Sequence, residues 1–386
     1  MYRSFKTEID PTPEQIIKIN RTIGTCRFIY NFFIAQNKEW YENGQPFLRG
    51  HAFNVWLNHE FLPNHPDHMW IKEVNTSAVK RSIDDADHAF QKFFKKKGGF
   101  PQFKKKNNSD VKMYFYRKGS RDCECERHRI KIPSLGWVRL KEKGYIPTTA
   151  SGVWVKSGRI SKRAGRYFVS VLIDIPEETT PVSVEMADGI GLHLGIRELA
   201  LTSTGVKFDN INKTDTIRKL EKRLSREHRR FSRKLEHKAH GGETQGRNIE
   251  KQKLKLQRLY RKISNIRDNY IDQTIAEIVK TKPSFIAISD INVSLLIQNR
   301  YVAKYLQGQK LRRFRERLTS KCHETGIELR IADKSFRSAS ICSSCGMLNK
   351  SASITSNTFR CSCGYVEDRS LNASYNLRDM AVYTTA

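Results

Sequence analysis

The chain has 386 residues, which is long enough for two or three domains. Hydrophobic residues make up 38% of it, which supports packed cores and argues against disorder along the whole chain. Its 70 Lys and Arg against 40 Asp and Glu leave a net charge of +30, so the sequence predicts a polyanionic partner. An anionic membrane is the weakest candidate, because no run reaches the roughly 18 apolar residues of a span and no signal peptide is evident. Cysteine usage without such a signal favours a reducing compartment.

The N-terminal part is predicted to be a short strand followed by helices. Pro11, Pro13 and Glu14 form a helix-start pattern, and a helix is expected over 14–44. A further helical region is expected over 50–97, with an apolar stripe that should face a core.

Two lysine triplets flank a Gly/Pro turn that carries Phe100 and Phe103. Basic side chains can neutralise phosphates while aromatic rings stack on bases. We expect phosphate contacts here, with a merely solvated loop as the alternative. The lysines are Lys95, Lys96, Lys97, Lys104, Lys105 and Lys106.

The second half changes from short alternating runs to an α/β pattern. The runs between 111 and 175 predict an antiparallel β unit and favour a small barrel. After them, apolar strands alternate with two long basic helices, 212–239 and 247–280, and a last helix is expected over 371–380. This order fits an RNase-H-like layered fold. The expected strands are 190–194, 199–202, 206–208, 284–289 and 327–331, and a helix is expected over 300–325.

Four cysteines near the C-terminus form a metal-ligand pattern. Cys342-x2-Cys345 is followed after fifteen residues by Cys361-x-Cys363, and a glycine follows each pair. Four thiolates suit tetrahedral zinc and leave no open coordination position, so we expect a structural Zn²⁺, with an iron–sulfur site as the minor alternative. Cys26 and Cys322 are expected to be core residues, whereas Cys123 and Cys125 lie in a charged loop where a second metal site is a minor alternative.

Several motifs resemble those of the TnpB proteins, transposon-encoded RNA-guided DNA endonucleases related to the type V CRISPR effectors. The stretch 367–376, directly after the cysteines, resembles the family's Asp-Arg-Asp-x-Asn-Ala-Ala-x-Asn motif at five positions. Segments near the N-terminus, around the lysine triplets, at 132–138 and at 191–200 also resemble family elements. The five matching positions are Asp368, Arg369, Asn372, Ala373 and Asn376.

The resemblance implies an α+β multidomain fold. A helical recognition region (21–107) and a wedge β-barrel (1–20 and 108–180) would precede a RuvC-like, RNase-H-like α/β domain (181–337 and 367–386). That last domain would carry a helical hairpin over 212–280 and a zinc-knuckle insert over 338–366.

The resemblance also implies where the nuclease centre should lie. The family holds two divalent ions with Asp, Glu and Asp, and His193, Asp290 and Ser370 stand at these positions here. Because Mg²⁺ favours anionic oxygen ligands, we expect no catalytic Mg²⁺ and no enzymatic activity. A Ser-His-Asp hydrolase triad is disfavoured, because no nucleophile elbow is evident.

The retained motifs together with this loss make the chain most similar to the nuclease-dead TnpB-like repressors (TldR). One protein bound to a guide RNA with an omega-RNA-like scaffold would then occupy promoter double-stranded DNA beside a short flanking motif, in the bacterial cytoplasm at the nucleoid. Arg49, Thr76 and Lys80 fall near the family's motif-reading positions. The alternatives are a weakly active or divergent RuvC-type RNA-guided endonuclease of a transposon, an RNA-binding or RNA-processing protein, and a conventional zinc-dependent repressor.

Overall fold

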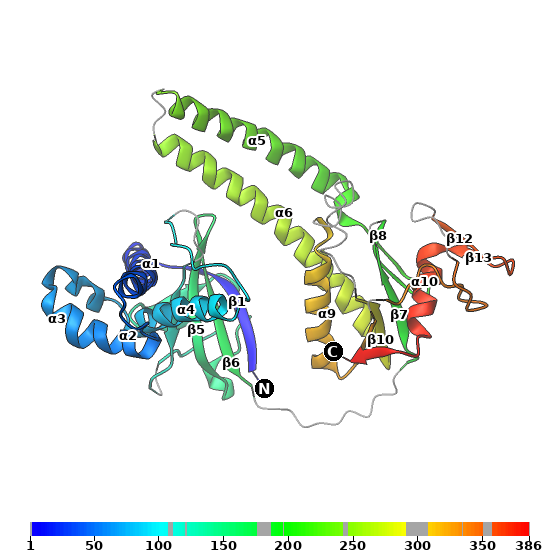
Figure 1. The fold of residues 1–386 in the computed structure, drawn as a ribbon. Coiled ribbons are helices and arrows are strands. Elements are labelled where there is room, and N and C mark those ends of the chain that lie inside the picture. Colours follow the sequence, from blue (N-terminus) through cyan, green and yellow to red (C-terminus); the bar gives the residue numbers. More distant parts are fainter. Residues whose placement is uncertain are drawn as a thin grey trace. The chain divides into compact units, whose positions relative to one another are not determined.

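The computed structural model describes residues 2–106, 111–119, 122–175, 187–195, 197–241, 246–290, 308–333, 335–349 and 357–385. It divides into two compact units, Met1–Thr180 and Pro181–Ala386 (Figure 1). Parts of some expected features lie outside the described residues, namely 300–307 of the expected helix, Ile196 of the 191–200 motif and 350–356 of the insert.

The first unit contains a six-stranded antiparallel sheet with the strand order β2-β5-β6-β1-β4-β3. Five of its strands confirm the β unit expected between 111 and 175, and β1 lies between β6 and β4. Among the described residues no pairing joins β2 to β3, so the barrel stays a prediction. The strands are β1 (Tyr2–Asp10), β2 (Met113–Tyr116), β3 (Arg129–Ile132), β4 (Gly136–Leu140), β5 (Trp154–Arg163) and β6 (Arg166–Asp174).

Helix α1 (Pro13–Glu42) confirms the expected first helix. Thr12 caps it, since the Thr12 side chain accepts from the backbone N–H of Gln15 while the Gln15 side chain accepts from the backbone N–H of Thr12.

The helical region expected over 50–97 is interrupted. After α2 (Gly50–Trp56) come a π turn (Leu57–Phe61), the single turn α3 (Leu62–Asn64) and a 3₁₀ segment (Pro66–Glu73). Pro63 and Pro66 explain the break, because proline has no N–H for the helix and restricts the residue before it. Regular helix resumes at α4 (Thr76–Phe94), where the Asn75 side chain accepts from the N–H of Ser77.

The second unit contains a mixed sheet with the strand order β14-β11-β10-β7-β8-β9. Strands β7, β10 and β11 are parallel neighbours, whereas β8, β9 and β14 pair antiparallel. This confirms the α/β order expected for this half. The strands are β7 (Ile190–Leu194), β8 (Glu198–Thr202), β9 (Lys207–Asp209), β10 (Phe285–Ser289), β11 (Glu328–Ala332) and β14 (Tyr383–Thr385).

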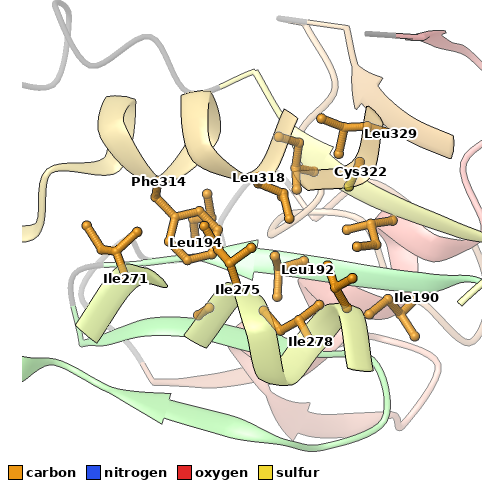
Figure 2. Close-up of a cluster of buried hydrophobic side chains, with 14 of the residues drawn as sticks. Ile190, Leu192, Leu194, Ile271, Ile275, Ile278, Phe314, Leu318, Cys322 and Leu329 are labelled. Carbon is orange, nitrogen blue, oxygen red and sulfur yellow. The ribbon is translucent and has the colours of Figure 1, made fainter. Parts of the chain in front are cut away.

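Helices cover both faces of this sheet. Helices α6 (Gly246–Lys280) and α9 (Leu311–Thr325) pack on the face that carries Ile190, Leu192 and Leu194 (Figure 2). Helix α10 (Arg369–Arg378) covers the opposite face, where a Cβ on Gly191 would lie 1.8 Å from the Ser374 carbonyl oxygen. Only glycine therefore lets α10 approach β7 this closely.

Helix α5 (Asp215–Ala239) and the first half of α6 form the expected basic hairpin, and they lie side by side in Figure 1. Buried Glu227 joins them, since its Oε2 accepts from Gln252 Nε2 at 2.8 Å and its Oε1 lies 3.0 Å from Lys255 Nζ. No helix within the described residues is long and apolar enough to cross a membrane.

Candidate metal centre and strand-end site

The four C-terminal cysteines converge on one point. Their Sγ atoms all lie within 4.8 Å of one another, with Cys342 and Cys363 3.8 Å apart and Cys345 and Cys361 3.6 Å apart. A tetrahedral zinc ion with Zn–S bonds of about 2.3 Å requires sulfur separations of about 3.8 Å, so these donors fit the ion. The predicted ligands are therefore brought together as expected.

Two tight turns position these thiols. Gly346 and Gly364 have φ values of +75° and +90°, which side-chain-bearing residues rarely adopt. Their N–H groups donate to the carbonyls of Cys342 and Cys361, respectively. A backbone hydrogen bond from Cys363, together with hydrogen bonds from the neighbouring thiols, lowers the pKa of Cys361, which favours the thiolate form that a metal ligand requires.

Cys123 and Cys125 lie in a different environment. Both are buried in the hydrophobic core of the first unit, and burial raises the pKa of Cys123 to about 12 and that of Cys125 to about 11. Among the described residues, Cys342, Cys345, Cys361 and Cys363 form the one cluster of three or more potential metal ligands. The structure therefore places Cys123 and Cys125 in the core, which the expected charged loop did not predict.

Two asparagines join the cysteine turns to α10. Asn372 is fully buried, its Oδ1 accepts from the N–H of Ser343 at 2.9 Å, and its Nδ2 donates to the Ile341 carbonyl at 2.7 Å. Asn376 Nδ2 donates to the carbonyls of Ser338 and Ile341. Hydrogen bonds thus join the segment that carries Cys342 directly to the helix that begins at Arg369.

The strand-end site begins with His193 in β7. Its Nδ1 is buried and has no hydrogen-bond partner within the described residues. Burial lowers the pKa of His193 to about 4, so the ring is neutral at physiological pH. Because Gly191 faces α10 and side chains alternate along a strand, His193 lies on the α10 face of the sheet.

Ser370 lies at the start of α10, where its N–H donates to Asp368 Oδ1 at 2.8 Å. Asp368 caps the helix and also accepts from the Arg197 guanidinium at 2.5 Å. Burial raises the pKa of Asp368, but Arg197 and the backbone N–H groups outweigh it and lower the pKa overall. Arg197 also pairs with buried Glu198, so one guanidinium bridges two carboxylates.

Asp290 lies elsewhere than the resemblance predicts. Ile286 and Ile288 of β10 belong to the core under α6 and α9, and Asp290, two residues on, pairs with Arg315 of α9. Ala287 packs on the α10 side instead. Strand alternation therefore places Ser289, not Asp290, on the face of His193.

The strand register supports the same assignment. Ile288 pairs with Leu192, so the next residues, Ser289 and His193, continue this alignment on the parallel strands. Sequence reasoning missed Ser289. Because Ser289 directly follows Ile288 in the strand, its side chain lies on the opposite face, and this alternation could have identified it. His193, Ser289 and Ser370 offer neutral donors, and this set does not fit a pair of Mg²⁺ ions.

The predicted nucleic-acid residues all belong to the first unit. Arg49 Nε lies 2.9 Å from Asp87 Oδ1, while Thr76 and Lys80 are exposed on α4. The lysines of both triplets are exposed except Lys104, whose ammonium lies 3.7 Å from the Tyr30 ring centroid. Sequence reasoning missed Arg81, Lys112 and Arg159, which line a hollow beside Lys104.

Comparison with known proteins identifies related chains. Family descriptions match residues 1–46 ("Helix-turn-helix domain"), 170–300 ("Probable transposase") and 312–377 ("Cas12f1-like, TNB domain"). The chain is 30% identical over 292 residues to "Putative RNA-guided DNA endonuclease InsQ" of Escherichia coli K12, covering 76% of this chain and 67% of that protein. A "Putative RNA-guided DNA endonuclease" of Streptomyces pristinaespiralis is 27% identical over 383 residues, covering 97% of this chain and 88% of that protein.

A solved structure shares the fold. The Cas12f1 chain of a complex with sgRNA and target DNA has a TM-score of 0.61 at 12% identity, over 95% of this chain and 82% of that one. This likeness supports an α+β multidomain fold. Despite the helix-turn-helix description, the fully described segment 2–46 contains β1 and the single helix α1.

The relatives correct one expectation. Loss of the metal-binding carboxylates led us to expect no enzymatic activity. Both related proteins are named as RNA-guided DNA endonucleases, which contradicts the prediction that this chain is not an enzyme. The physical reason is that replaced side chains identify a changed donor set, whereas activity depends on the whole centre and on the ion it uses.

Proposed function

The chain belongs to the transposon-encoded IS605 OrfB (TnpB) family, and on that premise we propose that it is a divergent RuvC-type, RNA-guided DNA endonuclease. The observation that carries the proposal is the strand-end arrangement, in which β7, β10 and α10 meet beside the turns that carry the four cysteines. The chain is also related to named endonucleases over most of its length.

The proposed partners are a guide RNA and a duplex DNA target, with one protein for each RNA. The net charge of +30 supports polyanionic partners, and the basic α5–α6 hairpin supplies an extended cationic surface. In such complexes base pairing selects the sequence, while the protein recognises a short flanking motif. Arg49, Thr76 and Lys80 are our candidates for that motif, and the two lysine triplets for phosphate contacts.

We assign the first unit to helical recognition and wedge roles and the second to a RuvC-like domain with a zinc insert. The four cysteines would hold a structural Zn²⁺. This ion would keep the turns around Cys342 and Cys361 in place, and through Asn372 and Asn376 it would hold the start of α10.

Cleavage by this centre is expected to be slow. Divalent ions, where bound, stabilise the charge that develops in phosphodiester cleavage. Here the α10 face offers His193, Ser289 and Ser370, and the nearby carboxylates of Glu198 and Asp368 are already paired with Arg197. A centre with so little free negative charge should hold such ions weakly.

Slow cutting favours a second function, repression of transcription by occupancy. A complex that stays on matched promoter DNA excludes polymerase whether or not the strands are later cut. The specific observation is that Asp290 and Asp368 each pair with an arginine, Arg315 and Arg197, respectively. A promoter–reporter strain that expresses the protein and a matching guide should show reduced transcription, and a scrambled guide should not.

The endonuclease proposal is tested with the purified protein–RNA complex. It is incubated with a matched and a mismatched duplex in Mg²⁺ or Mn²⁺, with EDTA and RNA-free protein as controls. We expect guide-dependent products that accumulate slowly. A matched duplex that stays uncut in both ions over many hours would overturn the cleavage part of the proposal.

A further inference from the structure

A basic hollow of about 130 Å³ lies in the first unit, between α1, α4 and the sheet. Four cationic side chains and one carboxylate line it, which leaves a net charge of +3 (4 − 1). The cations come from separate parts of the chain and include none of the predicted residues except Lys104. They are Arg81, Lys104, Lys112 and Arg159, and the carboxylate is Asp85.

Two of these cations are held in place by the fold. Lys104 Nζ lies 3.7 Å from the Tyr30 ring centroid, and the Lys104 backbone is fixed by two hydrogen bonds with the Asn31 side chain. The Arg81 guanidinium lies over the Tyr114 ring at 5.5 Å, and its Nε lies 3.1 Å from Asp85 Oδ1. Side chains that are already ordered lose little entropy when a ligand binds.

The other side of the hollow is open to a ligand. Tyr114 of β2 and Arg159 of β5 are directly opposite partners in the sheet. The Arg159 side chain is exposed and has no hydrogen bond or ion pair with the other described residues. The lining cations outnumber the lining carboxylate, so an anion at the centre would reduce the repulsion among their like charges.

We propose that this hollow binds a backbone phosphate of the bound nucleic acid, either the guide RNA or the target DNA. The inference rests on the proposed RNA-guided function. A phosphate accepts charge-assisted hydrogen bonds from several guanidinium and ammonium groups at once. The hollow has room for several water molecules, and so for a phosphate group. Phosphates of RNA and of DNA share this chemistry.

The test compares Arg159→Gln with Arg139→Gln, an exposed arginine on β4 of the same sheet that lies outside the hollow. Binding is measured at several salt concentrations in two arms. The first arm measures how tightly protein stripped of RNA binds the RNA that co-purifies with it. The second measures how tightly the RNA-loaded complex binds a matched DNA duplex. We expect Arg159→Gln to weaken binding about tenfold in one arm and to reduce the slope of log affinity against log salt concentration there by about one. Arg139→Gln should have little effect.

The affected arm identifies the source of the phosphate, RNA in the first case and DNA in the second. If both variants change binding equally in both arms, and their thermal unfolding midpoints are unchanged, the inference is overturned. The proposed function still stands in that case, provided that the wild-type protein binds. If the wild-type protein binds neither the RNA nor the matched duplex, the proposed function fails and this inference fails with it.

Discussion

The cysteine site and the strand-end site both border α10, but they assemble in different ways. The cysteines come from two tight turns, and all four sulfur atoms meet within 4.8 Å. His193, Ser289 and Ser370 come from β7, β10 and α10, and which side chains meet depends on strand register. A site built from local turns is therefore specified by spacing alone, whereas a site built across strands also requires the face on which each residue lies.

The largest effect should come from removing a cysteine ligand. Cys342→Ser leaves three thiolates, so the protein should lose its roughly one bound zinc per chain, and the insert should lose its order. Structural zinc contributes about 10–16 kcal/mol in isolated zinc fingers. Metal analysis and protease sensitivity of the insert measure both effects.

Cys322→Ala is the matched control, because Cys322 is buried in the core under α9 and is not part of the cluster. This variant should keep its zinc. Equal zinc contents in wild type and Cys342→Ser would contradict the metal assignment.

The strand-end site should respond to added carboxylates. The variant His193→Asp/Ser289→Glu/Ser370→Asp places three carboxylates on the α10 face, and we expect Mg²⁺-dependent cutting of matched DNA to rise by about 10²–10³-fold. The matched variant has Asp290→Glu in place of Ser289→Glu. It should gain much less, because position 290 lies beside Arg315. A larger gain from the Asp290→Glu combination would refute the assignment of faces.

These two sites also mark what sequence reasoning could predict. The start of α1 near Pro13, the strands from β7 to β11 and the cysteine cluster followed from local patterns. The face on which Asp290 lies did not follow from a local pattern, because a shift of one residue in a strand moves a side chain to the other face. The pairs Arg197 with Asp368 and Arg315 with Asp290 join residues far apart in sequence, and no local pattern predicts them.

The link between the two sites can be weakened at Asn372. Asn372→Ala removes the hydrogen bonds to the Ser343 N–H and the Ile341 carbonyl, which leaves the Ser343 N–H without this partner while the carbonyl keeps its bond from Asn376. We expect the free energy of unfolding to fall by about 2–4 kcal/mol in urea denaturation. The control is Asn349→Ala, whose half-buried side chain donates to the Arg360 carbonyl at 2.8 Å, and a cost near or above that of Asn372→Ala would argue against the link.

The smallest effect is the pH dependence of His193. Its pKa is about 4 in the folded chain, below the ordinary value of 6.5, so the unfolded state binds more protons between these values. Wild-type stability should therefore fall as pH drops from about 6.5 to about 4, by roughly 1–3 kcal/mol at this site. His193→Gln lacks this loss, so the unfolding free energy of the variant relative to wild type should rise as the pH falls from about 6.5 to about 4. A pH-independent difference would contradict a desolvated, neutral ring at His193.

The central claim is that a guide RNA directs this protein to duplex DNA. The most direct measurement is binding of the RNA-loaded complex to a duplex that matches the co-purified guide, at about 0.2 M salt, where non-specific contacts weaken. We predict that the matched duplex is retained while a duplex with mismatches next to the flanking motif is released. Equal retention of both duplexes, or binding that needs no RNA, would contradict the account.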